Sequence, residues 1–132
     1  MCGFVGFTGH LAQGESVLKN MMDAIIHRGP DSAGTHIDEG ASLGFRRLSI
    51  IDLDSGSQPM YNETKDIVIV FNGEIYNYQE LRKELIEKGH VFSNNADTEV
   101  LIHGYEEYGE DLLSRLRGMF AFVIWDSRNK QR

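Results

Sequence analysis

The residue of this chain best suited to catalysis is a cysteine at position 2. If the initiator Met1 is removed, Cys2 carries a thiol of reference pKa about 8.5 and an α-amino group of reference pKa about 7.7–8.0. The amine is then a base poised near neutral pH, within one residue of a nucleophile. The alternative is a small buried hydrophobic residue at the start of a strand, and position alone favours it. While Met1 remains, Cys2 has no free amine and the catalytic use is blocked.

The dipeptide Asn72-Gly73 also has two interpretations. Asn-Gly is the commonest tight hairpin turn, although the following residues lead to a helix start and not to a returning strand. The alternative is an oxyanion hole, in which the Asn72 amide and the Gly73 N–H both donate to one developing negative charge. Glycine there would let the backbone approach closely. In either case we expect Asn72-Gly73-Glu74 to break the preceding apolar strand.

Four charged residues are candidates for binding the two ends of an amino acid. Arg46 and Arg47 are adjacent in a strand-like segment, so they face opposite sides, and one of them can point into a site. A guanidinium suits an α-carboxylate because it binds two oxygens at once. Asp97 is either the N-cap of a helix or a carboxylate that binds an α-ammonium, and the sequence favours the cap. Glu74 is either a surface charge or a second acceptor for the same ammonium.

The five histidines show no metal-ligand spacing, and we expect no metal site. His103 has no partner histidine on its own helix, and His27 is expected to close a helix C-terminus. The single cysteine excludes an intrachain disulfide and any cluster of cysteine metal ligands.

Length and charge limit the remaining possibilities. A chain of 132 residues suits one domain, and a net charge of −7 argues against nucleic acid or an anionic membrane as the main partner. No apolar run is long enough to cross a bilayer, and the N-terminus shows no signal peptide. The cytoplasm is therefore the expected compartment.

Hydrophobic patterning predicts alternating strands and helices, and hence layered sheets covered by helices. The first half of the chain begins with a glycine-bearing strand at 3–8 and a helix with apolar residues from Leu18 to Ile26, which is ended by basic residues, Gly and Pro. Short strands at 34–37 and 42–50, a loop at 52–59 and a strand at 67–71 that is buried on both faces follow. The second half has a helix that begins with a capping box of Asn77 with Glu80 and is closed by Gly89, a helix from about Thr98, a shorter helix that ends at Gly118, and a buried strand at 119–125. No partner strand follows this last strand and its turn, so it is expected to leave an open sheet edge, as in a domain cut short.

Several motifs along the whole chain resemble the N-terminal-nucleophile (class II) glutamine amidotransferases, in particular the branch of the glutamine-hydrolysing asparagine synthetases. They are Met1-Cys2-Gly3-Phe4-Val5-Gly6, His27-Arg28-Gly29-Pro30-Asp31-Ser32, Arg47-Leu48-Ser49-Ile50-Ile51-Asp52, Phe71-Asn72-Gly73-Glu74-Ile75-Tyr76-Asn77, Ala96-Asp97-Thr98-Glu99-Val100 and Leu116-Arg117-Gly118-Met119-Phe120-Ala121-Phe122. The resemblance implies an α+β fold, the αββα four-layer sandwich of Ntn hydrolases. Two antiparallel sheets lie between helix layers, here incomplete at the C-terminus.

The resemblance also implies roles for the residues singled out above. Cys2, freed of Met1, attacks the side-chain amide carbon of glutamine, and its amine takes the thiol proton and helps ammonia to leave. Asn72 and Gly73 hold the oxyanion, and water then hydrolyses the thioester to glutamate.

Substrate binding follows from the same resemblance. Arg47 binds the glutamine α-carboxylate, and Asp97 and Glu74 bind its α-ammonium. The backbone that lines the pocket belongs to Leu48, Ser49, Ile50 and Ile51.

The resemblance further implies that residues 1–132 are a partial amidotransferase domain without the ATP-dependent synthetase domain of its parent. ATP and Mg belong to that missing domain, and this domain needs no cofactor. The expected partners are L-glutamine, the synthetase domain and a second copy in a homodimer. The alternatives are the amidotransferase half of another amide-forming synthetase, or an inactive truncated fragment.

Overall fold

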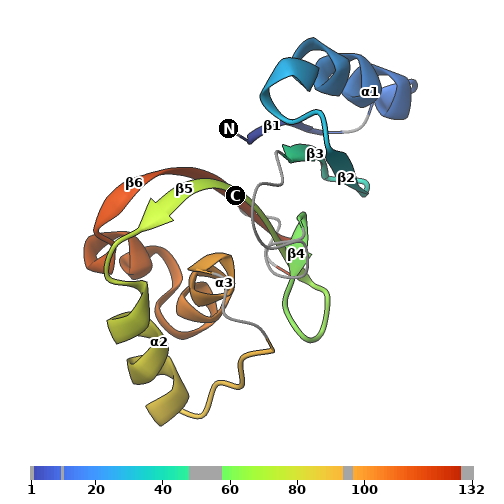
Figure 1. Cartoon of the computed structure of the whole chain (residues 1–132). Coiled ribbons are helices and arrows are strands. Elements are labelled where there is room, and N and C mark those ends of the chain that lie inside the picture. The colour runs from blue at the N-terminus through green and yellow to red at the C-terminus, as the bar shows by residue number, and fades with distance from the viewer. Residues whose placement is uncertain (1, 10, 48–57, 94–96, 129–132) are drawn as a thin grey trace.

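Four layers are stacked in the order helix, sheet, sheet, helix in the computed structural model (Figure 1). The structure describes residues 2–9, 11–47, 58–93 and 97–128. The first sheet has the order β1-β3-β2, and its strands are β1 (Gly3–Thr8), β2 (Ser32–Ile37) and β3 (Ala41–Arg47). The second has the order β4-β5-β6, and its strands are β4 (Met60–Tyr61), β5 (Ile67–Ile75) and β6 (Gly118–Asp126). All pairings within both sheets are antiparallel.

Helices cover the two outer faces. Helix α1 (Gly14–Ala24) packs on the first sheet, and α2 (Tyr78–Glu87) and α3 (Asp97–Tyr108) lie beneath the second (Figure 1). Two short 3-10 helices are η1 (Ile26–Arg28) and η2 (Gly109–Arg115). The predicted αββα arrangement is confirmed. Within the described residues, no helix is long and apolar enough to cross a membrane.

Strand β5 lies at the centre of the molecule and is covered on both faces, as its unbroken apolar run predicts. Ile67, Ile69 and Phe71 pack with residues of α2 and α3, whereas Val68 and Val70 pack between the sheets. The inter-sheet cluster also contains Ala41, Leu43 and Phe45 of β3 and Trp125 of β6. This alternation matters for the site, because it sets which side chains of β5 face β1.

The expected break at Asn72-Gly73-Glu74 is wrong, and so is the hairpin turn. The pairing with β6 continues without a bulge from Ile67 to Ile75, with Asn72 opposite Ala121 and Gly73 opposite Phe120. A distant partner strand supplies the ladder here, and it overrides the local turn preference of Asn-Gly. Gly73 adapts by adopting a φ of 139°.

The capping box is also wrong, although Asn77 does occupy the N-cap position of α2. Its side chain makes no cap bond; the amide donates to the carbonyl of Arg115 at 2.8 Å and accepts from the N–H of Arg117 at 3.0 Å. The chain entering β6 therefore takes the polar groups that a cap would use. The predicted closure at Gly89 is confirmed: its φ is 100°, and the N–H groups of Gly89 and His90 bond the carbonyls of Ile86 and Leu85.

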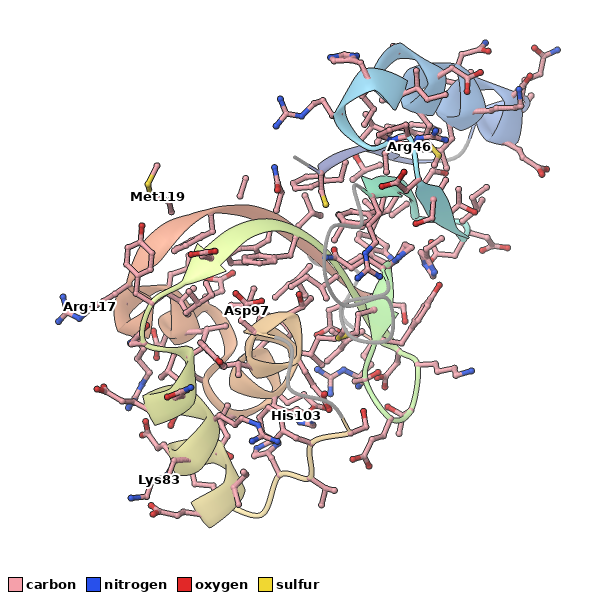
Figure 2. All side chains as sticks on the ribbon, viewed as in Figure 1. Arg46, Lys83, Asp97, His103, Arg117 and Met119 are labelled. Atoms are coloured by element: carbon pink, nitrogen blue, oxygen red, sulfur yellow. The ribbon has the colours of Figure 1, made fainter. Side chains whose placement is uncertain are left out.

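The end of α1 and the burial of β6 also differ from the prediction. Helix α1 ends at Ala24, and the basic residues before Gly29 lie in η1 instead. Strand β6 is at the sheet edge in the described part of the chain, as expected, but it is buried only near its end. Met119 is 74% exposed and projects away from the helices (Figure 2). The predicted strand residues 48–50 and most of the 52–59 loop lie outside the described residues.

Candidate functional site

Cys2 lies beside Arg47 at one end of the first sheet. The ladder pairs Gly3 with Arg46 and Phe4 with Phe45, so one more residue of the same register puts Cys2 opposite Arg47. Cys2 is half-buried and packs, with Phe4, against the inter-sheet cluster. Its side chain is therefore on the face of the sheet that looks toward β5.

The two adjacent arginines face opposite sides, as predicted. Arg46 lines a groove with α1 residues, and its Nε donates to the carbonyl of Gly29 at 3.0 Å (Figure 2). Arg47 shares the parity of Phe45, which packs between the sheets. The arginine assigned to the substrate is thus the one whose position in the strand faces the second sheet.

Arg28 binds the backbone of Cys2. Its Nε donates to the carbonyl of Cys2 at 3.2 Å, and a Cβ at Gly3 would lie 3.2 Å from the same side chain. Sequence reasoning missed this role, because it assigned Arg28 only to the end of a helix. Its place directly before Gly29-Pro30 in one of the quoted motifs was the available signal.

Asn72 lies on the face of β5 that is turned toward the first sheet. It has the parity of Val68 and Val70, which belong to the inter-sheet cluster, and β1 and β5 contact each other. Asn72 and Cys2 therefore enter the same layer of the molecule from opposite sheets.

Backbone N–H groups along one edge of β5 point away from β6. The N–H of Phe71 donates to Oε1 of Gln58 at 2.5 Å, and the N–H of Ile75 donates to Oδ2 of Asp97 at 3.2 Å. Because ladder bonds alternate, the N–H of Gly73, midway between them, points to this edge too. Gln58 was not singled out from the sequence; its amide also donates to the carbonyl of Phe71 at 3.0 Å and fixes the edge.

No residue with a side chain fits at Gly73. A Cβ there would lie 2.2 Å from the carbonyl oxygen of Met119 and 2.5 Å from the Cα of Phe120, both backbone atoms. The close approach found here is that of the β6 backbone, and the expected approach of the Gly73 backbone to an oxyanion stays a prediction.

The carboxyl of Asp97, at the start of α3, is within the electrostatic influence of the Glu74 carboxylate. Asp97 is the first residue of the helix, and Figure 2 shows it below β5. Burial raises the pKa of Asp97 above its ordinary value of 3.8, and the nearby charge of Glu74 raises it further, while hydrogen bonds from backbone N–H groups oppose the shift. A cation bound between these carboxylates would relieve both penalties.

The described residues thus place Cys2 and Asn72 on the facing sides of the two sheets, and they place Asp97 under the edge of β5 to which the Gly73 N–H points. The predicted pocket residues Leu48, Ser49, Ile50 and Ile51 lie outside the described residues. Hydrolysis of the side-chain amide of an amino acid needs a nucleophile, hydrogen-bond donors for the oxyanion, a cationic group for the α-carboxylate and anionic groups for the α-ammonium.

Comparisons with known proteins agree with this chemistry. A family model described as a glutamine amidotransferase domain matches residues 1–132. Similar relatives include the glutamine-hydrolysing asparagine synthetase 1 of Bacillus subtilis (strain 168), 52% identical over 98% of this chain and 21% of the relative. The glutamine-hydrolysing asparagine synthetase of Zea mays is 45% identical over 98% of this chain and 22% of the relative. The chain therefore spans about a fifth of the length of these relatives.

Solved structures share the fold. Glutamine phosphoribosylpyrophosphate amidotransferase from B. subtilis, complexed with ADP and GMP, matches with a TM-score of 0.75 and 22% identity over 96% of this chain and 35% of the other. A structure described as the allosteric regulatory enzyme of purine biosynthesis matches with a TM-score of 0.76 and 22% identity, over 96% of this chain and 36% of the other.

Proposed function

Because this chain belongs to the glutamine amidotransferase domain family, we propose that it is the glutaminase half of an asparagine synthetase. It hydrolyses L-glutamine to glutamate and ammonia through a thioester on Cys2. In the full-length parent, the ammonia amidates aspartate.

The reaction begins once Met1 has been removed. The Cys2 sulfur attacks the side-chain amide carbon of glutamine while the α-amino group of the same residue takes the thiol proton. The oxyanion accepts hydrogen bonds from the Asn72 amide and the Gly73 N–H, and each such donor is worth about 2.7–4 kcal/mol in the transition state. The ammonium of Cys2 returns its proton to the leaving nitrogen, and water then cleaves the thioester.

The two ends of the substrate are held by opposite charges. Arg47 binds the α-carboxylate through its planar guanidinium, and Glu74 and Asp97 bind the α-ammonium. The backbone of Leu48, Ser49, Ile50 and Ile51 lines the pocket. The neighbouring charge that raises the pKa of Asp97 supports this assignment, since an ammonium between the two carboxylates removes their repulsion.

The observation that carries the proposal is the layout of the β5 edge. The Gly73 N–H points to that edge, between two N–H groups that are already bonded, in a strand whose Asn72 faces the sheet that carries Cys2. A fixed pair of donors across from a nucleophile is the geometry that oxyanion stabilisation requires.

Several features of the parent belong to the same proposal. Its synthetase domain uses ATP and Mg, whereas the amidotransferase reaction itself uses no cofactor. We propose the cytoplasm as its compartment, where a free nucleophilic thiol stays reduced, and a homodimer as its assembly. The names of the relatives favour aspartate as the acceptor over the acceptor of another amide-forming synthetase.

Glutamate release from L-glutamine tests the proposal. The chain with Met1 removed should produce glutamate and ammonia in equal amounts, and Cys2→Ala should abolish both products. L-asparagine, one methylene shorter, should be a poor substrate. A Cys2→Ala chain that retains normal glutamate release would refute the mechanism, and a processed, folded chain that releases no glutamate would identify an inactive fragment.

A further inference from the structure

Two histidines outside the candidate active site face each other, one just after the end of α2 and the other in the middle of α3. The Nδ1 atoms of His90 and His103 lie 3.1 Å apart, and Oε1 of Glu106 lies 3.2 Å from Nδ1 of His103 and 3.9 Å from Nδ1 of His90. Figure 2 shows His103 on the side of α3 next to the chain that follows α2. His103 has no second histidine on its own helix, and the turn after α2 brings His90 to it.

These three atoms have the spacing of a metal site. A triangle with sides of 3.1, 3.2 and 3.9 Å has a point about 2.0 Å from all three corners, which is the bond length of zinc to imidazole nitrogen and carboxylate oxygen. No rearrangement of the three side chains is needed to bring them within bonding distance of one ion.

Each of the three side chains is oriented from behind by a further group. His90 Nε2 lies 2.9 Å from Oε1 of Glu107, and His103 Nε2 lies 3.4 Å from Oε1 of Glu99. The buried Asn62 amide donates to the other oxygen of Glu106 at 3.1 Å. Carboxylates behind histidine ligands are the usual supporting groups of zinc sites, because they fix the ring and keep its inner nitrogen free to bind metal.

The three inner atoms are close to one another in a way that a metal ion would satisfy best. A hydrogen shared between the two Nδ1 atoms would satisfy one of the three contacts, whereas a metal ion would satisfy all three. The outer contacts suit this arrangement, because an imidazole whose Nε2 donates to a carboxylate presents its Nδ1 lone pair to a metal.

The negative charge and the burial of the cluster formed by His90, His103 and Glu106 also favour binding of a cation. Three carboxylates, those of Glu99, Glu106 and Glu107, surround two imidazoles. His103 is only 4% exposed, and the ring of Phe92 packs 4.4 Å from its ring. The Glu106 side chain is partly exposed, which leaves a path for an ion and a position for a water ligand.

We propose that His90, His103 and Glu106 bind one divalent ion of the zinc class, with water as a fourth ligand. The ion joins the segment after α2 to α3. Its role is structural, because it lies on the helix layer and not in the inter-sheet layer that holds Cys2.

Isothermal titration with zinc chloride tests this proposal in the 132-residue chain made metal-free and carrying Cys2→Ala, which removes the only thiol. We expect one zinc ion per chain, and a rise in melting temperature on addition of zinc. His90→Gln and Glu106→Gln should each weaken binding by at least about 100-fold, and Glu107→Gln by about 10–100-fold. His36→Gln is the matched control: its ring also pairs with a carboxylate, Asp38, at 2.9 Å but lies in the first sheet.

Cobalt(II) gives a second readout, because the intensity of its visible absorption reports coordination number. The wild-type ligand set should give the intense bands of a four-coordinate ion, and His90→Gln should lose them while its circular dichroism spectrum stays unchanged. Two results would overturn the proposal. One is that the metal-free chain carrying Cys2→Ala binds no zinc. The other is that folded His90→Gln and Glu106→Gln variants of that chain bind zinc as tightly as the chain without these substitutions.

Discussion

At the scale of single residues, the most informative group is Asp97, because its environment works against its own charge. Burial and the neighbouring Glu74 raise its pKa, whereas hydrogen bonds from backbone N–H groups, including that of Ile75, oppose this shift. A structural N-cap alone would not need a second carboxylate nearby. The arrangement is instead suited to a ligand that brings a positive charge.

The raised pKa of Asp97 predicts a pH dependence of substrate affinity. The ionised carboxylate binds the ammonium, and it is lost as pH falls through a pKa that lies above 3.8. The KM for glutamine should therefore rise as pH falls into that range. Asp97→Asn should raise KM at neutral pH by roughly 10-fold or more, since a charged hydrogen bond is worth about 1.5–3 kcal/mol, and should flatten the pH profile.

Steady-state kinetics between neutral and mildly acidic pH measures this effect. Asp111→Asn is the control, because Asp111 is exposed on η2 and should change neither KM nor its pH profile. An Asp97→Asn chain with the parent's KM and pH profile would remove Asp97 from the binding site.

The same carboxyl also affects folding stability in a defined direction. A carboxyl with a raised pKa takes up a proton on folding in the window between 3.8 and its folded pKa. Its ionisation therefore costs stability as pH rises through that window, and the bound ammonium offsets this cost. The site is thus less stable empty than filled.

At the scale of elements, β5 and β6 determine the shape of the backbone around Gly73, where we propose the oxyanion site. Gly73 has both a left-handed φ of 139° and backbone atoms of β6 where a Cβ would be placed. Gly89 also has a positive φ, of 100°, but a Cβ there would meet nothing within 4 Å. The two positions separate the cost of backbone strain from the cost of a steric clash.

Gly73→Ala should therefore destabilise the chain clearly more than Gly89→Ala. Gly89→Ala should lower the free energy of unfolding by about 1–2 kcal/mol through strain alone. Gly73→Ala adds a clash with the Met119 carbonyl that only a shift of β6 can relieve. Urea unfolding measures both variants, and equal losses would mean that β6 does not constrain Gly73.

The secondary-structure predictions were correct where the signal lies in neighbouring residues. They failed where a segment distant in the sequence binds the same residues. The unbroken apolar run at 67–71 identified a strand covered on both faces, and Gly89 identified a helix end. The predicted turn at Asn72-Gly73 was wrong because β6, more than 40 residues later, pairs with these residues. The predicted cap at Asn77 was wrong because the chain just before β6 binds the Asn77 side chain.

The candidate site shows the same limit. The motif residues could be chosen from their chemistry and from the resemblance, but Gln58 and Arg28 could not, since their roles depend on which backbone groups the fold brings near them. The pairing of His90 with His103 likewise depends on the turn after α2, which residue spacing does not reveal.

At the scale of the whole molecule, the proposed reaction needs the two sheets to stay in register, because Cys2 is on one and Asn72 on the other. Trp125 of β6 contributes to this connection. Its Nε1 donates to Oδ2 of Asp38, in the turn between β2 and β3, at 2.8 Å, and its ring fills the space where a Cβ of Gly40 would lie. Although burial alone would raise it, the pKa of Asp38 is lowered by hydrogen bonds from His36, two backbone N–H groups and Trp125.

Trp125→Phe should weaken the connection between the sheets. The lost hydrogen bond to a charged group predicts a fall of about 2 kcal/mol in the free energy of unfolding, and glutaminase activity should fall because the two halves of the site are less well aligned. Tyr76→Phe is the control, since Tyr76 is 65% exposed. Unfolding by urea and glutamate release are the two measurements, and a Trp125→Phe chain equal to the control in both would contradict the prediction.

The most direct test concerns the shared origin of the nucleophile and the base in Cys2. Glutamate release should be compared between the chain that begins at Cys2 and a matched chain with one extra glycine before it, which keeps the thiol but moves the free amine away. A base held in position contributes about 10²–10⁴-fold, so the extended chain should be slower by that factor at neutral pH. Equal rates in the two chains would show that the amine of Cys2 takes no part in the reaction.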